Sequence, residues 1–62
     1  MKRTALVKYL IEHGCSLFKE GSNHTVFINN NGNGISAVPR HTEIGNRLAE
    51  EICKQLGIPK IK

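Results

Sequence analysis

Four apolar residues near the start of the chain recur at the spacing that gathers side chains on one helix face: Leu6, Val7, Leu10 and Ile11. Thr4 precedes them and is a residue type that caps helix N-termini. Gly14 follows them and suits the left-handed position just after a helix. We therefore predict a first helix between Thr4 and Gly14, with one buried apolar stripe.

The pattern then changes to short segments of the kind found in strands. We predict strands over residues 15–19, 24–29 and 35–38, and the second of these is rich in β-branched and aromatic residues. Residues 20–23 (Glu-Gly-Ser-Asn) are typical of a turn. Residues 30–34 contain two Asn-Gly pairs, which favour a tight hairpin because both residue types tolerate positive φ.

A second apolar repeat falls at every fourth position, with two further residues widening its stripe: Ile44, Leu48, Ile52 and Leu56, then Ala49 and Cys53. It predicts a second helix that begins at Thr42 or shortly after, runs to about Leu56, and is ended by Gly57 and Pro59. Two helices with one apolar stripe each need a common surface. We expect an α+β fold of order α-β-β-β-α, with a three-stranded antiparallel sheet, both helices on one face, and one domain over residues 1–62.

The second predicted strand carries apolar residues on both faces. His24, Val26 and Ile28 share one face, whereas Thr25 and Phe27 share the other. The alternation therefore favours neither face as the open one. An exposed Phe27 would mark a partner-binding patch.

Size and charge restrict the class of function. A chain of 62 residues buries only about 60% of the surface that its unfolded form exposes, so a deep pocket is not expected. The formal net charge is +4, which favours polyanionic partners, nucleic acid first, although many small soluble domains are mildly basic.

The two cysteines, Cys15 and Cys53, lie singly among apolar residues and lack CxxC spacing. They are expected to be small buried apolar residues in a reducing compartment. The start of the chain lacks the pattern of an export signal, and no apolar stretch has transmembrane length. We expect a cytoplasmic protein with no membrane partner.

His24 is the candidate for chemistry, because it opens a strand directly after a glycine-containing turn. The imidazole group has an unperturbed pKa near neutrality and suits proton transfer. Gly21 allows close approach of a phosphate to the backbone, and Ser22 is a possible hydroxyl donor. Without further knowledge, a strand histidine after Gly-Ser-Asn is more often structural than catalytic.

Three basic side chains are candidates for phosphate contact: Lys19, Arg40 and His41. Arg40 offers two parallel donors, and the predicted start of the second helix near Thr42 favours anions. The simpler interpretation is that Arg40 and Lys19 are solvated charges and that His41 braces the entry to the helix. No metal or other cofactor is expected, since the chain has no aspartate, its glutamates do not converge, and its cysteines and histidines lack zinc spacing.

The chain resembles the HicA-type mRNA interferase toxins over almost its whole length. The resemblance rests on the element order, on Gly21-Ser22-x-His24 opening the second strand, on Pro39-Arg40-His41 before the last helix, and on the closing Leu56-Gly57-Ile58. It implies a fold similar to double-stranded-RNA-binding domains (dsRBD-like). It also implies RNA cleavage by a single histidine and silencing by a HicB-type antitoxin.

Position by position, His24 matches the catalytic histidine of that family, and Gly21 and Ser22 match the turn that presents it. Asn23 stands where members often have a second histidine. Cys15 replaces a large aromatic residue that often begins the first strand.

Three classes of function follow. The first is a metal-independent endoribonuclease that cleaves mRNA as the toxin of a type II toxin-antitoxin system. The second is a non-catalytic RNA-binding module with a dsRBD-like fold. The third is a small protein-interaction domain whose basic face meets an acidic partner.

Overall fold

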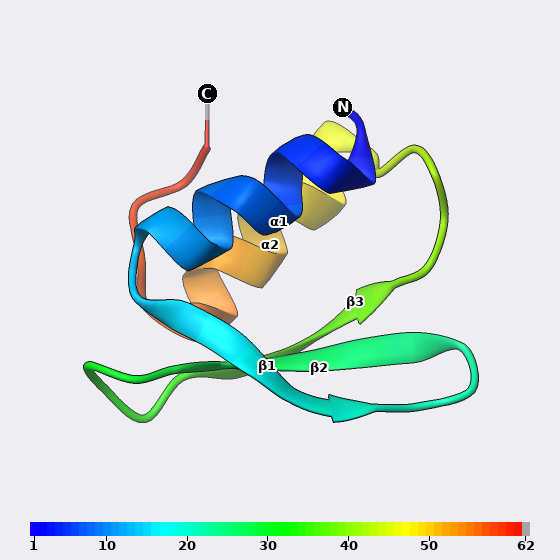
Figure 1. Ribbon diagram of the computed structural model, residues 1–62. Coiled ribbons are helices and arrows are strands. Elements are labelled where there is room, and N and C mark those ends of the chain that lie inside the picture. The colour runs from blue at the N-terminus through cyan, green and yellow to red at the C-terminus, as the bar shows by residue number, and fades with distance from the viewer. Residues whose placement is uncertain (62) are drawn as a thin grey trace.

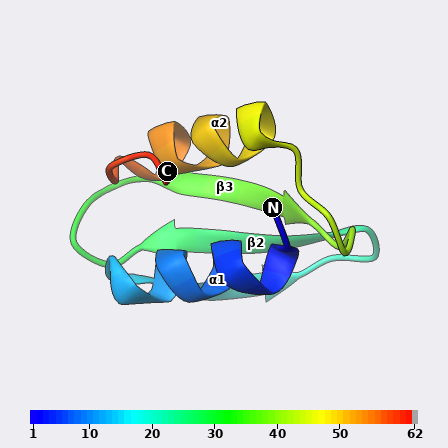
Figure 2. The ribbon, with the colours of Figure 1, turned by 90° about the horizontal axis from the view of Figure 1, so that it is seen from above.

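The computed structural model describes residues 1–61 and contains the predicted order of helix, three strands and helix. The elements are α1 (Arg3–Glu12), β1 (Cys15–Glu20), β2 (His24–Asn29), β3 (Ile35–Pro39) and α2 (Asn46–Leu56). The strands form one antiparallel sheet in the order β1-β2-β3. Both helices cover the same face of this sheet (Figure 1), with α1 packed on β1 and α2 on β3 (Figure 2). The predicted α+β fold is therefore confirmed.

The first helix begins without the predicted cap. Its N-cap residue is Lys2, which makes no side-chain capping bond, and Thr4 lies exposed in the first turn. The backbone supplies an alternative restraint, because the amide of Arg3 donates to the carbonyl oxygen of Thr42 at 2.9 Å. The buried stripe is also narrower than predicted: Leu6 and Leu10 are fully buried, whereas Ile11 is 58% exposed.

The second helix begins at Asn46, four residues later than the earliest predicted start. Residues 42–44 are instead non-helical, and Glu43 pairs with the beginning of the chain through a bridge to Lys2. The amide of Ile44 donates to the carbonyl oxygen of Met1 at 2.8 Å. Ile44 is buried from this non-helical segment rather than from a helix, so its place in the four-residue repeat misled the prediction.

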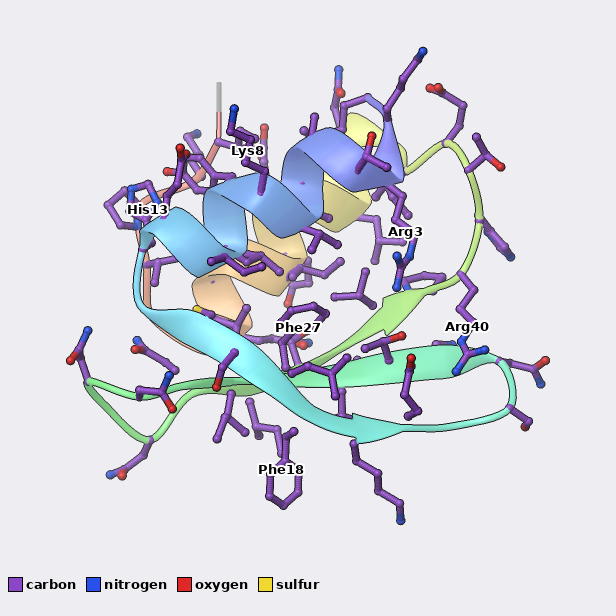
Figure 3. All side chains as sticks on the ribbon, in the orientation of Figure 1. Arg3, Lys8, His13, Phe18, Phe27 and Arg40 are labelled. Atoms are coloured by element: carbon purple, nitrogen blue, oxygen red, sulfur yellow. The ribbon has the colours of Figure 1, made fainter. Side chains whose placement is uncertain are left out.

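The helix-covered face of the sheet is now identified by burial. Its buried members are Cys15, Thr25, Phe27, Ser36 and Val38. They complete a core with Leu6 and Leu10 of α1 and with Ala49, Ile52, Cys53 and Leu56 of α2. Phe27 is only 3% exposed and lies between the sheet and the helices (Figure 3), so it forms no partner-binding patch. The open face carries His24, Val26 and Ile28.

The predicted hairpin joins β2 to β3, but neither of its glycines has the positive φ that the Asn-Gly pairs suggested, and Gly34 is needed for a different reason. Among residues 1–61, only Gly14 and Gly57 have positive φ, at 86° and 72°, and both follow helices as predicted. At Gly34 a Cβ atom would clash with the carbonyl group of Leu56. The Asn29 side-chain amide donates to that same carbonyl oxygen at 2.8 Å. The hairpin therefore holds the end of α2 by close approach.

Both cysteines are free and buried, as predicted. Burial raises the pKa of the Cys15 thiol, and the nearby Cys53 raises it further. A raised thiol pKa lowers the fraction of reactive thiolate at neutral pH. Across residues 1–61, neither helix has both the length and the apolar character needed to cross a membrane.

Candidate functional site

His24 is the first residue of β2, and its side chain is exposed. Because successive side chains of a strand point to opposite faces, burial of Thr25 under the helices places His24 on the open face. The register sets Pro39 of β3 directly opposite His24. His24 therefore stands where the β1–β2 turn meets the end of β3.

The turn before His24 is closed by its own backbone. The amide of Gly21 donates to the carbonyl oxygen of His24 at 2.8 Å. This N–H group is therefore already bonded and is not free to donate to a phosphate. Ser22 and Asn23 are exposed at the tip, and the Ser22 hydroxyl makes no hydrogen bond to the described part of the chain.

Arg40 lies at the same end of the sheet as His24. Its amide donates to the carbonyl oxygen of Asn23 at 3.4 Å, which joins the end of β3 to the β1–β2 turn. Its guanidinium donates to Oε1 of Glu20 at 2.8 Å, and 45% of the side chain remains exposed. One anchored nitrogen leaves other donors of Arg40 facing solvent.

A polar network links Arg40 to α1 on the helix-covered side of the sheet. Thr25 Oγ1 donates to Glu20 Oε1 at 2.7 Å and accepts from Arg3 Nη2 at 3.0 Å. Arg3 Nε donates to the carbonyl oxygen of Pro39 at 2.9 Å. The network therefore ties together the ends of the three strands around His24, from the side opposite its ring.

The carboxylate of Glu20 is the acceptor at the centre of this network. The Thr25 hydroxyl, followed by the charge of Arg40, lowers the pKa of Glu20 below its usual range. A lowered carboxyl pKa means that the folded state favours the charged form. Glu20 bonds to Thr25 on the helix-covered face, so it does not orient the His24 ring.

Lys19 reaches the open face. It lies opposite Val26 in the register, and directly paired residues point to the same side of a sheet. His24 is two residues from Val26 in β2, which makes Lys19 its diagonal neighbour at about 7–8 Å between backbones. Lys19 and His24 therefore share the open face, whereas Glu20 holds the Arg40 guanidinium toward the helix-covered side at the same end of the sheet.

His41 lies in the connection between β3 and α2, outside the polar network around Glu20. His41 is exposed, and no hydrogen bond joins its side chain to another residue within 1–61. The dipole argument for anion binding near Thr42 is wrong, because α2 starts only at Asn46, with Gly45 as its N-cap residue. The basic pair Arg40-His41 therefore lies in the irregular connection between β3 and α2 rather than at a helix entrance.

Arg3 is the member of this site that the sequence analysis missed. Arg3 is the second residue of a basic Lys-Arg pair near the chain start, and nothing in its local sequence signals that it restrains the strand ends around His24. Its contacts to Thr25 and Pro39 span 22 and 36 residues. Only the folded chain brings these groups together.

The site has no deep cavity. The surface depression lined by Arg47, Glu50 and Lys54 has a volume of about 500 Å³ and lies on α2, away from His24. Within residues 1–61, no three His, Cys, Asp or Glu side chains converge in a way that holds a metal ion. A ligand of His24 must therefore lie across the open end of the sheet.

Comparison with known proteins identifies the family. The sequence model described as the HicA toxin of bacterial toxin-antitoxin matches residues 4–58. The chain belongs to the HicA toxin family. The match spans all three strands and α2, and it includes His24 and Arg40. A HicA toxin belongs to a toxin-antitoxin pair, so family membership implies an antitoxin partner. Searches of curated proteins and of solved structures returned no match.

Proposed function

We propose that this HicA-family chain is a metal-independent endoribonuclease that cleaves mRNA as the toxin of a type II pair, with His24 as its proton-transfer group. One observation carries the proposal. His24 stands exposed on an open sheet surface, with Lys19 diagonal to it and Arg40 at the same end. This arrangement supplies a proton-transfer group and two positive charges, which are the groups that RNA cleavage needs.

RNA brings its own nucleophile to such a site. As the 2′-oxygen attacks the adjacent phosphorus, His24 takes the proton of the 2′-hydroxyl. The bond between phosphorus and the 5′-oxygen then breaks, and the leaving oxygen receives a proton from water. His24 returns its proton to solvent, and the products end in a 2′,3′-cyclic phosphate and a 5′-hydroxyl. General-base help of this kind accelerates a reaction by about 10²- to 10⁴-fold.

The cations at the edges of the surface stabilise the negative charge on the phosphate oxygens. Glu20 holds the half-exposed guanidinium of Arg40 through one nitrogen at the end of the sheet, and its other donors are assigned to phosphate oxygens of an RNA strand that crosses this end. Lys19 supplies a second positive charge from the strand on the other side of β2. Gly21, Ser22 and His41 are assigned to binding the flanking nucleotides, because they border the same end of the sheet.

The cleavage chemistry selects the nucleic acid, and family membership suggests the partner. DNA lacks the 2′-hydroxyl, so the protein is proposed to cleave RNA and to leave DNA intact. The antitoxin is proposed to be of the HicB type, acting in the cytoplasm where mRNA is accessible.

The test compares wild-type protein with His24→Ala on a defined RNA in the presence of EDTA. We expect wild-type cleavage to persist with the chelator and to fall by about 10²- to 10⁴-fold in the variant. His13→Ala is the matched control, because His13 ends α1 at the opposite end of the sheet from Arg40 (Figure 3). It should cleave like the wild type.

A second experiment addresses the role as a toxin. Expression of the wild-type chain should arrest bacterial growth, whereas expression of His24→Ala should not. If wild-type protein binds RNA without cutting it under any of these conditions, the non-catalytic RNA-binding module replaces the nuclease. Equal growth of cells that express the two chains would show that toxicity does not depend on His24.

A further inference from the structure

Strand β1 contains one more residue than the stretch of β2 that it faces. Leu17 lies opposite Phe27, but the next pair is Lys19 with Val26, so Phe18 has no partner in the ladder. This is a β-bulge, a feature that re-aims side chains and is over-represented beside functional sites.

The bulge reverses the alternation of β1 at its far end. Beyond it, Lys19 shares the open face with Val26, and Glu20 shares the helix-covered face with Thr25. In a regular strand, each of these two side chains would point the other way. Glu20 would then lie directly opposite His24. The extra residue therefore places a cation on the His24 face and moves a carboxylate off it.

The bulged residue itself projects from the open face. Figure 3 shows Phe18 pointing away from both helices, and its side chain is 61% exposed. Val26 and Ile28 of β2 line the same face and are half-buried. Phe18 is therefore mostly open to solvent, although Phe27 on the neighbouring strand is almost fully buried.

We propose that Phe18 stacks on a base of single-stranded RNA, and that the bulge forms one strip from Phe18 through Lys19 to His24 along which the RNA lies. The proposal rests on RNA being the ligand of the His24 site. Proteins that bind single strands combine aromatic platforms for bases with cations that follow the phosphates. The strip offers both in consecutive residues, at the start of the surface that ends in His24.

Charge favours RNA over a protein as the occupant. The strip has a lysine and a histidine beside one aromatic ring and no carboxylate, because the bulge turns Glu20 to the other face. The chain as a whole has a net charge of +4. An aromatic ring next to a lysine matches a base and its adjoining phosphate.

The chain contains no tryptophan, so Phe18→Trp introduces a single fluorescent reporter at the proposed contact. The titrant is a short 2′-O-methyl RNA, which binds but has no 2′-hydroxyl to be cleaved. We expect saturable quenching as bases stack on the indole ring, and much weaker quenching with an abasic oligonucleotide of the same length. Leu48→Trp is the control, because Leu48 is 41% exposed on α2, and its fluorescence should not change.

Affinity measured by anisotropy of the labelled oligonucleotide completes the test. Phe18→Ala and Phe18→Leu should both bind about tenfold more weakly, since leucine keeps the apolar contact but loses the ring. Ile35→Ala, which removes an exposed apolar side chain at the other end of β3, should bind within twofold of the wild type.

Wild-type affinity in Phe18→Leu, or tight binding without quenching in Phe18→Trp, would overturn the stacking proposal. So would a Phe18→Ala variant that binds RNA normally and loses only the antitoxin. These readouts do not involve cleavage. If His24→Ala is inactive but stacking is absent, the nuclease proposal stands and the stacking proposal fails. If His24→Ala still cleaves RNA, the catalytic role of His24 fails, and stacking is judged by affinity alone.

Discussion

The two faces of the three-stranded sheet both carry apolar side chains, yet they have different fates in the folded chain. On the covered face, Phe27 and Val38 are at most 3% exposed and pack against two helices. On the open face, Phe18 and Ile35 are more than half exposed. One face therefore supplies the burial that stabilises so small a domain.

The difference shows where this fold is free to vary for function. A change on the covered face alters packing, and a chain of this size has little stability to spare. Side chains on the open face contribute little to burial, so their identities are free to serve ligand binding. His24, Lys19 and Phe18 all lie on that face, whereas the network that restrains the strand ends lies on the other.

The largest expected effect comes from a matched pair of phenylalanines on the two faces. Phe27→Ala should lower the free energy of unfolding by about 3–5 kcal/mol, because it opens a cavity in the core. Phe18→Ala should change it by less than about 0.5 kcal/mol. Urea denaturation followed by circular dichroism measures both. Similar losses of unfolding free energy in the two variants would mean that the two faces contribute equally to stability.

A substitution in the β2–β3 hairpin tests how tightly α2 is held against the covered face. Gly34→Ala should cost about 1–3 kcal/mol, because the new methyl group meets the Leu56 carbonyl and forces the backbone to shift. Gly32→Ala is the control, since its Cβ atom would be at an ordinary 3.7 Å from the nearest side chain, Asn29. Thermal melting of the two variants should separate them clearly. Equal melting temperatures would show that the close approach at Gly34 carries no cost.

The polar network is the part of the covered face nearest to His24. Thr25→Val keeps the shape of a buried side chain but removes the hydroxyl that joins Glu20 to Arg3. We expect a loss of about 1–3 kcal/mol in unfolding free energy, because both charged groups lose a partner. Thr42→Val, at an exposed position, should be nearly neutral. A Thr25→Val variant as stable as the Thr42→Val variant would show that the polar network does not stabilise the fold.

The smallest expected effect depends on pH. Because the pKa of Glu20 is lowered in the folded state, its charge stabilises the fold above the pKa of the unfolded chain, about 4.3 for glutamate. That contribution is lost as pH falls through the folded value. Glu20→Gln should therefore have a lower melting temperature than the wild type at pH 7, and the gap should narrow at pH 3. Glu51→Gln, which removes a carboxylate without an ion pair in the described chain, should show no such narrowing.

Much of the fold could be predicted because its signals are local. Periodic apolar residues marked both helices, and Gly14 and Gly57 marked their ends through positive φ. The second strand was predicted with the bounds that the structure has. The start of α2 was wrong because Ile44 continues the helical repeat in sequence while pairing with Met1 in space.

The candidate site was predictable only in part. His24 could be singled out because it follows a turn and opens a strand, and the family resemblance extended that prediction. Arg3 could not, because its partners are Thr25 and Pro39. The exposure of Phe18 was equally hidden, since a bulge depends on how two strands align rather than on either strand alone.

The amino-acid sequence by itself determined the order of the elements, the turns and the apolar stripes, because these depend on neighbouring residues and their period. Tertiary structure alone decided which sheet face stays open, where Lys19 and Glu20 point, and why Gly34 is needed. Each of these depends on the register or close approach of segments that are distant along the chain. A shift of one residue in register reverses the direction of a side chain without changing the sequence pattern.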